Sequence, residues 1–408
     1  MMQAVADFPF TAPFAAPQGS AIRELFKHLA TPGMISFAGG YPSPDLFDRD
    51  GLAAAAAEAW QGAAGECLQY GPTEGLPALR EALAARMRAH GAQADPAQVL
   101  VTTGSQQAFD LLVRVLVAPG DTVVVERPTY SAALQALRLA QANVLSVGMD
   151  GDGLDVEALA SLLAAQPAER RPKLIYTVPT FANPSGATLT LARRRRLLEI
   201  VAEYGVLLVE DDPYGELRFS GEPVPTLAAL AKGVPGAEPW VVYLGSLSKV
   251  LAPGLRLGWM HGAAPLLRRC VIAKQTVDLC TPPWLQAVAA SYLRQGRLDA
   301  QIVRIADAYR ARATTLCTAL RARLGGRFDF TEPQGGMFVW GRWRDGTDAT
   351  ALLNTAIEEK VMYVPGAPFF SEQSDRAALR LCFTMSTPVE IETGVGRLAQ
   401  AAARHAAA

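Results

Sequence analysis

Hydrophobic residues form short continuous runs between about residue 95 and residue 260, separated by stretches rich in alanine, leucine and arginine. The runs do not alternate polar and apolar residues, which is typical of strands buried on both faces of a sheet. Repeated strand–helix–strand units predict an α/β fold with a mostly parallel, doubly wound sheet covered by helices on both faces. The predicted strands are 99–102, 122–125, 144–147, 174–178, 206–209, 241–244 and 257–260, and the predicted helices are 108–117, 131–139, 154–165 and 191–204.

The pattern changes beyond about residue 285. A long helical stretch rich in alanine and arginine runs to Leu324, and β-prone segments follow at 328–330, 337–340 and 379–383. This order predicts a smaller α+β domain. We therefore expect three parts: an N-terminal arm and helix that joins the small domain (1–45), a large domain (46–290), and a small C-terminal domain (291–408).

Composition and charge exclude several classes of protein. Half of the residues are hydrophobic and 19% are charged, which is globular composition. Lys plus Arg number 38 and Asp plus Glu 39, so a net charge of −1 argues against a nucleic-acid partner. The run Arg193–Arg196 is expected to be the solvated face of a helix. Apolar runs stay below the ~18 residues of a membrane span, and the five scattered cysteines indicate reduced thiols, so we expect a cytoplasmic protein.

Polar residues follow the ends of several predicted strands. Because the carboxyl ends of parallel strands lie at one edge of a sheet, we expect the loops after them to meet in one crevice. These loops contain Gly104–Gln107, Pro128–Tyr130, Asn183–Gly186, Glu210–Tyr214 and Gly245–Lys249.

Some of these groups are suited to a phosphate. Gly104–Gln106 at a helix start offers free N–H groups, and Ser246, Ser248 and Arg256 add hydroxyls and a guanidinium. The sequence contains neither GxxxxGK[ST] nor GxGxxG, so this is not a nucleotide loop of either type. The four histidines have no metal-ligand spacing, and we expect no metal.

Other groups suit an aromatic ring and a carbonyl. Lys249 lies near Arg256, and neighbouring positive charge favours a neutral, nucleophilic amine. Asp211 at a buried strand end could hold a protonated ring nitrogen, and Tyr130 could stack on the ring. An anionic tail, a basic ring nitrogen and an aldehyde for a lysine together describe pyridoxal 5′-phosphate (PLP).

Residues from about 20 to 400 resemble the fold-type-I, class I/II PLP-dependent aminotransferases, above all the 2-aminoadipate/kynurenine aminotransferase group, which is related to the catalytic domain of MocR-type regulators. The most specific likeness is EDDPY followed by SLSK, with Arg256 seven residues after Lys249. The resembling segments are ISFAGGYPSPDLF (35–47), QYGPTEGLPALREAL (69–83), VTTGSQQAFDL (101–111), ERPTY (126–130), FANPSG (181–186), EDDPYGEL (210–217), GSLSKVLAPGLRLGW (245–259), QGGMFVW (334–340) and LRLCF (379–383).

The resemblance implies a role for each matched residue. Lys249 would form the internal Schiff base and carry the proton between substrate and cofactor, and Asp211 would pair with the pyridinium nitrogen. Asn183 and Tyr214 would hydrogen-bond the ring 3-oxygen, and Tyr130 would cover the ring. The residues implied to hold the phosphate are Ser105, Gln106, Ser246, Ser248 and Arg256.

The resemblance also implies a shared site and a substrate clamp. Tyr70 would reach the phosphate of a neighbouring subunit, so a homodimer is expected. Arg380 would bind the substrate α-carboxylate, with Asn183, Gly39 and Gly40 in the same pocket. Arg23 either meets a side-chain carboxylate of the substrate or is an ordinary charge on a helix surface. Tyr41 departs from the family, in which leucine is frequent, so no substrate preference is carried over.

The implied activity is transfer of the amino group of an L-amino acid to a 2-oxo acid, with 2-oxoglutarate expected, in a ping-pong cycle. A PLP-dependent lyase, decarboxylase or racemase on the same fold remains an alternative. A regulator that only senses a ligand would need a DNA-binding domain, and about 20 residues precede the first matched motif. The sequence leaves the donor open among aminoadipate, aromatic, branched-chain and broad specificity.

Overall fold

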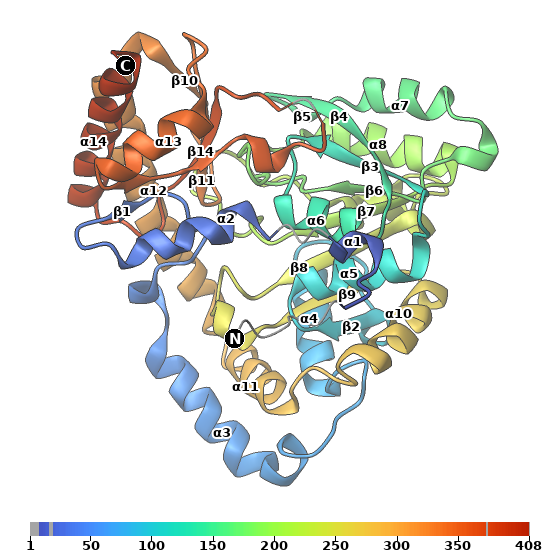
Figure 1. Cartoon of the computed structure of the whole chain (residues 1–408). Helices are drawn as coiled ribbons and strands as arrows, with labels where there is room; N and C mark the ends of the chain where they lie inside the picture. Colours follow the sequence, from blue (N-terminus) through green and yellow to red (C-terminus); the bar gives the residue numbers. More distant parts are fainter. Residues whose placement is uncertain (1–7, 16–18, 373, 408) are drawn as a thin grey trace, which may run out of the picture.

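The computed structural model describes residues 8–15, 19–372 and 374–407. Its largest element is an eight-stranded sheet in the order β2-β9-β8-β7-β6-β3-β4-β5 (Figure 1). Strands β3, β4, β6, β7 and β8 are parallel to their neighbours in that group, whereas β9 and β5 run antiparallel to theirs. The strands are β2 (Val99–Thr102), β3 (Thr122–Arg127), β4 (Asn143–Asp150), β5 (Gly153–Leu154), β6 (Leu174–Thr177), β7 (Leu207–Asp212), β8 (Val241–Ser246) and β9 (Gly258–His261).

Helices cover both faces of this sheet. Successive residues of β3 enter different hydrophobic cores, since Val123 and Val125 pack in one and Val124 in the other. This is the doubly wound arrangement that the continuous apolar runs predict. The helices around the large sheet are α4 (Pro77–Ala89), α5 (Ser105–Leu116), α6 (Ser131–Leu139), α7 (Val156–Ala164), α8 (Leu191–Tyr204), α9 (Leu227–Leu230) and α10 (Ala264–Val277).

A second, antiparallel sheet has the order β10-β11-β14-β13. Its strands are β10 (Phe328–Phe330), β11 (Phe338–Trp343), β13 (Val364–Pro365) and β14 (Ala378–Cys382), and the nearby helices are α12 (Leu298–Leu324), α13 (Ala349–Glu358) and α14 (Pro388–Ala406). The sequence predicted one long helical stretch before this sheet. The structure has two helices there, α11 (Pro283–Arg294) and α12, because Gly296 adopts a left-handed φ of +68° between them.

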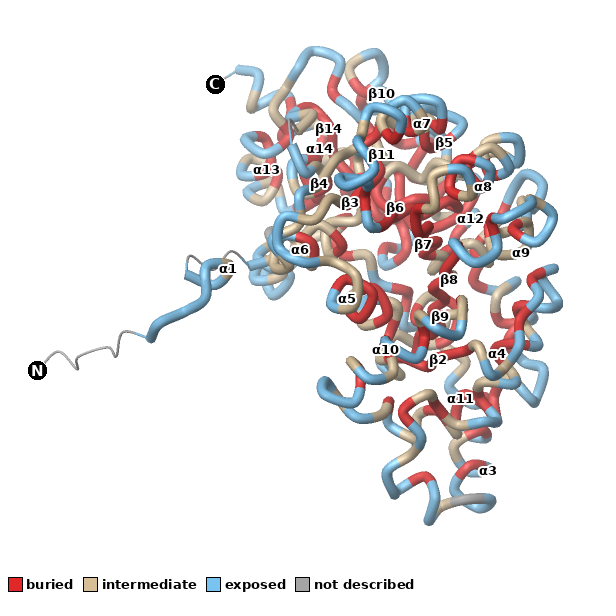
Figure 2. Tube along the Cα trace, turned by 90° about the vertical axis from the view of Figure 1, so that its right-hand side faces the viewer, coloured by how far each residue is buried: buried red, intermediate tan, exposed pale blue. Residues whose placement is uncertain are grey.

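The N-terminal segment packs against the C-terminal part of the chain. Strand β1 (Ile35–Ser36) pairs in parallel with β12 (Val361–Met362), and Ile22 and Leu25 pack beside Met362. Before it lie α1 (Ala12–Ala15), α2 (Ala21–Glu24) and the 3-10 helix η1 (Leu25–Ala30). Figure 2 shows that the chain around α1 projects away from the body of the protein.

Helix α3 (Arg49–Cys67) packs along α11 and reaches the lower end of the molecule in Figure 1. In the described part of the chain, no helix has the length and apolar character needed to cross a membrane. The remaining short 3-10 helices are η2 (Pro44–Leu46), η3 (Pro96–Gln98), η4 (Ala168–Arg170), η5 (Ala231–Gly233), η6 (Glu238–Trp240), η7 (Pro253–Leu255), η8 (Gly325–Arg327) and η9 (Ala367–Phe369).

The expectation of a fully solvated Arg193–Arg196 run is wrong at one position. Arg194 is completely buried, and its guanidinium donates to the carbonyl oxygens of Leu189 and Pro179, both at 2.9 Å. Consecutive residues of a helix point about 100° apart, so one member of a four-residue run must turn toward the sheet. Arg194 therefore ties α8 to the loop after β6.

Candidate active site

The loops after the parallel strands meet around a cavity of about 290 Å³. The convergence expected from the strand ends is present, since β2, β3, β6, β7 and β8 all lead into its walls. The cavity also receives residues of α2, β11 and β14, so the second sheet closes one side. The predicted site residues that line it are Arg23, Gly40, Ser105, Gln106, Tyr130, Asn183, Asp211, Tyr214, Ser246, Ser248, Lys249, Arg256 and Arg380.

Asp211 lies in β7 near its carboxyl end and is buried. Its Oδ2 accepts a hydrogen bond of 2.7 Å from the Tyr176 hydroxyl, whereas its Oδ1 has no partner among the described residues. Burial is the main cause that raises the pKa of Asp211 to about 7, and the Asp212 charge adds to it, although Tyr176 and the nearby Ser105 side chain act in the opposite direction. A buried carboxyl oxygen without a donor is suited to a protonated ring nitrogen of a ligand.

Lys249 follows β8, and its Nζ donates to the carbonyl oxygen of Gly40 at 3.0 Å. Burial lowers the pKa of Lys249 to about 8; Cys382 opposes this shift, while the Arg380 and Arg256 charges add to it. An amine with such a pKa is neutral in a substantial fraction of molecules near pH 8. The Lys249 side chain is therefore suited to attack a carbonyl carbon.

An anion cradle lies at the start of α5. Gly104 precedes the helix with a φ of +81°, and a Cβ there would lie only 2.6 Å from Nη2 of Arg256. The first N–H groups of a helix have no partner within it and point toward ligands, here those of Ser105 and Gln106. Ser246 Oγ accepts from the Ser248 backbone N–H at 3.2 Å, which places two hydroxyl side chains at the same cavity wall.

Arg380 in β14 is a buried cation. Its Nη1 donates to Asn183 Oδ1 and its Nη2 to the Ala38 carbonyl oxygen, both at 2.8 Å. Its Nε is buried without an acceptor, and no carboxylate of the described chain forms an ion pair with it. Because an unpaired buried charge is costly, Arg380 is suited to bind a carboxylate from a ligand.

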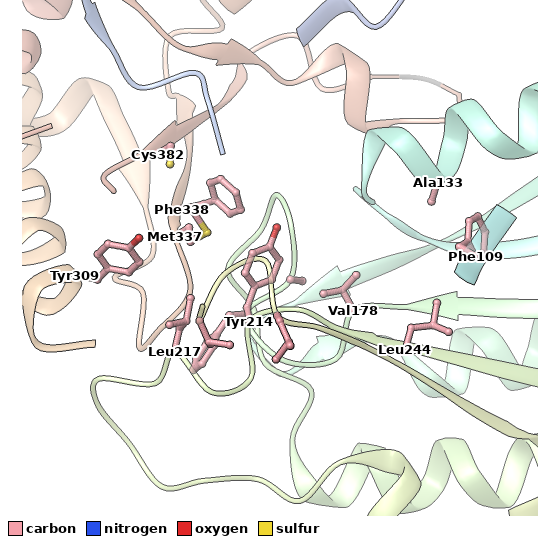
Figure 3. Close-up of a cluster of buried hydrophobic side chains, with 14 of the residues drawn as sticks. Phe109, Ala133, Val178, Tyr214, Leu217, Leu244, Tyr309, Met337, Phe338 and Cys382 are labelled. Carbon is pink, nitrogen blue, oxygen red and sulfur yellow. The ribbon is translucent and has the colours of Figure 1, made fainter. Parts of the chain in front are cut away.

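Tyr214 connects the two sheets at the floor of the cavity. Its hydroxyl accepts from Asn183 Nδ2 at 3.4 Å, and its ring meets Phe338 edge-on with centroids 5.7 Å apart. Figure 3 shows Tyr214 between Val178 on one side and Met337 and Phe338 on the other. Burial raises the pKa of Tyr214, so the hydroxyl keeps its proton and can donate to a ligand oxygen.

Two of the predicted residues do not line the cavity. Tyr70 is 78% exposed and lies beside a surface hollow lined by Leu68, Cys280 and Pro283. Gly39 lies behind the wall, where a Cβ would come within 2.8 Å of the Tyr41 ring, so a larger residue there would crowd that ring.

Sequence reasoning missed several wall residues. Tyr176 is the most informative, because its hydroxyl, buried within β6, needs a partner and finds it in Asp211 Oδ2. Phe338 lies on the other side, below the Arg380 guanidinium at 4.2 Å. At the mouth, the rings of Phe26 and Tyr41 lie 5.4 Å apart. No local signal in the sequence placed Phe338 or Phe26 in this site.

The donor set fits PLP on three separate observations. Asp211 Oδ1 is an orphaned buried acceptor for a ring N–H. The Gly104 turn leaves room beside Arg256 that a Cβ would fill, at the start of a helix. Lys249 offers an amine of lowered pKa in the same cavity.

Comparison with known proteins agrees with this chemistry. The model of the family "Aminotransferase class I and II" matches residues 41–398. The chain is 40% identical to an aromatic-amino-acid aminotransferase of Thermococcus litoralis over 94% of this chain and 91% of that protein. It is also 40% identical to a 2-aminoadipate transaminase of Thermus thermophilus over 94% of each. A crystal structure of Pyrococcus horikoshii kynurenine aminotransferase, containing PMP, covers 97% of both chains with a TM-score of 0.91 and 40% identity.

The chain therefore belongs to the class I and II aminotransferase family. It is a PLP-dependent transaminase of fold type I, and its substrates are an amino acid and a 2-oxo acid. The resemblance seen in the sequence motifs is thereby confirmed at the level of family, fold, activity and cofactor.

Proposed function

We propose that this transaminase moves the amino group of an L-amino acid to 2-oxoglutarate in a ping-pong cycle, with two half-reactions in one site. A single observation carries the proposal: the orphaned Oδ1 of Asp211, the Lys249 amine and the unpaired Arg380 cation face one cavity. They are the groups needed for a ring nitrogen, a carbonyl carbon and a substrate carboxylate.

Three side chains act on the reacting atoms. When bound, PLP supplies an aldehyde carbon that condenses with amines and a protonated ring that draws electrons from the substrate Cα. Lys249 would hold the cofactor through its aldehyde carbon, and its freed Nζ would take the proton from the substrate Cα and deliver it to that former aldehyde carbon. Asp211 accepts the ring N–H at Oδ1 and so keeps that nitrogen protonated. Tyr214 donates to the ring 3-oxygen, with Asn183 beside it.

The remaining cofactor contacts fix orientation. Tyr130 covers one face of the ring. The phosphate is held by the backbone and side chains at the start of α5 and by the loop after β8, through Ser105, Gln106, Ser246, Ser248 and Arg256. Together these five residues would fix the phosphate and so keep the aldehyde end of the cofactor near Lys249.

The substrate α-carboxylate binds Arg380, with the side-chain amide of Asn183 as a second contact. Asn183 already orients the guanidinium, since its Oδ1 accepts from Nη1 at 2.8 Å. Gly40 forms the opposite wall, where its carbonyl oxygen lies 3.0 Å from Lys249 Nζ, and Gly39 lies directly behind it. A clamp of this kind presents the Cα–H bond to the lysine.

The substrate side chain extends toward the mouth of the cavity. Phe26 and Tyr41 present aromatic rings there, and Arg23 on α2 presents a guanidinium. This combination accommodates both aromatic donors and donors with a distal carboxylate, in agreement with the names of the two relatives above.

Replacement of Arg23 by alanine should lower kcat/KM for 2-aminoadipate and leave kcat/KM for phenylalanine unchanged. Equal effects on both substrates would show that Arg23 is an ordinary charge on the helix surface.

The half-reaction tests the proposed chemistry. Mixing the holoenzyme with phenylalanine or 2-aminoadipate, without any oxo acid, should convert the visible cofactor absorbance to that of the pyridoxamine form once per site. Added 2-oxoglutarate should restore it. Stopped-flow spectroscopy follows both steps. Continued release of ammonia, CO₂ or the D-isomer without oxo acid would instead show lyase, decarboxylase or racemase chemistry.

A substitution of Arg380 tests the proposed carboxylate contact in the same assay. Arg380→Leu removes the cation proposed to bind the α-carboxylate and leaves only the Asn183 amide, so kcat/KM for amino acids should fall about 10²- to 10³-fold. The rate with an amine that lacks a carboxylate, such as phenethylamine, should change less than tenfold because that substrate never used the clamp. An equal loss for both substrates would contradict the assignment.

We also propose a homodimer with shared sites. Leu68 and Tyr70 are more than two-thirds exposed beside the hollow formed by Cys280 and Pro283, and Phe8, Phe10 and Phe14 of the N-terminal arm are exposed as well. A second copy would cover these apolar side chains and bring its Tyr70 hydroxyl to the phosphate. Sedimentation equilibrium should give twice the chain mass of 43.4 kDa. A stable, active monomer would refute this arrangement.

A further inference from the structure

A polar cluster around a buried lysine lies behind the phosphate cradle, outside the cavity lining, and its Asp278 borders the surface hollow beside Tyr70. Lys274 of α10 is completely buried. Its Nζ donates to both carboxylate oxygens of Asp278, at 2.7 and 2.9 Å, and to Gln107 Oε1 at 3.1 Å. A lysine is almost never fully buried without such partners, so this ion pair is a built feature of the fold.

The cluster holds the residue that precedes the cradle. Thr103 Oγ1 donates to Asp278 Oδ2 at 3.0 Å, and the Thr103 backbone N–H donates to Gln107 Oε1 at 2.8 Å. Gln107 Nε2 in turn donates to Asp278 Oδ2 at 2.8 Å. Thr103 is thus held by its side chain and its backbone at the same time.

The position of Thr103 sets the geometry of the cradle. Its carbonyl oxygen accepts from Arg256 Nη2 at 3.4 Å, and the next residue, Gly104, has the left-handed φ of +81° that starts α5. On the other side, a Cβ on Gly258 would lie 2.5 Å from Ser105 N, so β9 leaves the turn little space to move. Displacing Thr103 would therefore redirect both the first N–H groups of α5 and the Arg256 guanidinium.

The charges in the cluster matter for an anion. Asp278 alone would place a negative charge directly behind the turn that binds a phosphate. The contact with Lys274 cancels that charge while the carboxylate still accepts hydrogen bonds from Thr103 and Gln107.

We infer that Asp278 and Lys274 are positioning residues for the cofactor phosphate, acting through Thr103 and Gln107; this rests on the proposed role of the α5 cradle as the phosphate site. The pair fixes the turn without adding net charge. It acts on the phosphate and not on the ring or the aldehyde, so its loss should be visible only with ligands that carry the phosphate.

A variant that keeps the ion pair gives the cleanest test. Thr103→Val together with Gln107→Met removes the bonds to the turn and leaves Lys274 and Asp278 paired. In apo protein, the Kd of PLP should rise about tenfold or more, whereas the Kd of pyridoxal should change less than twofold. Equilibrium dialysis with absorbance detection measures both. Asp110→Asn, which breaks an exposed pair with Arg114 on the same helix, is the control and should change neither Kd.

The charge variants give an independent reading. Lys274→Met leaves the Asp278 charge behind the cradle, so it should weaken PLP binding more than Asp278→Asn does, with pyridoxal again little affected. An unchanged PLP affinity in the double variant, or equal losses for PLP and pyridoxal, would overturn the inference. If the unmodified chain itself bound PLP no better than pyridoxal, the cradle assignment would fail instead, so the two failures are distinguishable.

Discussion

Replacing Lys249 with alanine should abolish transamination, with kcat reduced by ~10⁴-fold or more. The variant loses both the amine that holds the aldehyde carbon and the base that takes the Cα proton, because one Nζ performs both tasks. Initial rates with an amino acid and 2-oxoglutarate measure the loss. PLP should still bind without a covalent link, since the phosphate cradle and Asp211 are untouched.

Borohydride reduction separates this result from a general loss of structure. In the unmodified chain it should attach the cofactor to Lys249, and peptide mass spectrometry should find the adduct there. Lys232→Ala is a matched control, because Lys232 is exposed, donates to Gln93 and lies outside the cavity lining. Normal turnover in Lys249→Ala, or an adduct at another lysine in the unmodified chain, would refute the assignment.

Asp211→Asn should reduce kcat about 10²- to 10³-fold, the range expected when one preorganised charge is removed from a buried site. An amide cannot keep the ring nitrogen protonated, so the ring would draw electrons from the substrate Cα less strongly. The slow step should become proton removal, seen as a larger kinetic isotope effect with α-deuterated amino acid. Asp150→Asn is the control, since that exposed carboxylate pairs with Arg193 outside the cavity lining.

The same variant should change how apo-protein stability depends on pH. Burial raises the pKa of Asp211 from 3.8 to about 7, so the folded chain binds this proton more tightly than the unfolded chain. The contribution of Asp211 to stability is therefore full below about pH 4 and is lost as pH rises toward 7. The Tm of apo Asp211→Asn minus the Tm of the unmodified apo protein should therefore increase as the pH is raised from 5 to 8. No change in that difference over this range would contradict the burial argument.

Much of the large sheet could be predicted because its strands are buried on both faces. Every apolar run predicted as a strand between residues 95 and 260 corresponds to a strand of the sheet, and helix α8 matches its prediction at both ends. The local sequence did not predict the features that depend on tertiary contacts. The direction of β9, the break at Gly296 and the burial of Arg194 depend on what packs against them. The division into three domains and the cytoplasmic location stay predictions.

The residues of the candidate site also fall into those that the sequence could bring together and those that it could not. Residues at or just after strand ends, such as Asp211 and Lys249, could be placed together because parallel strands end at one edge. Arg380 and Asn183 could be named only through the resemblance, since 197 positions separate them and their 2.8 Å contact exists only in the folded chain. Tyr176 and Phe338 were missed because each lies within a strand, where an aromatic side chain is normally ordinary core.

By itself, the amino-acid sequence determined which segments become strands and helices and which chemical groups the chain possesses, because hydrophobic periodicity and side-chain chemistry are local properties. Only the tertiary structure decided which of those groups lose water and partners. The lowered pKa of Lys249, the raised pKa of Asp211 and the unpaired Arg380 guanidinium all arise from burial, and burial depends on residues hundreds of positions apart.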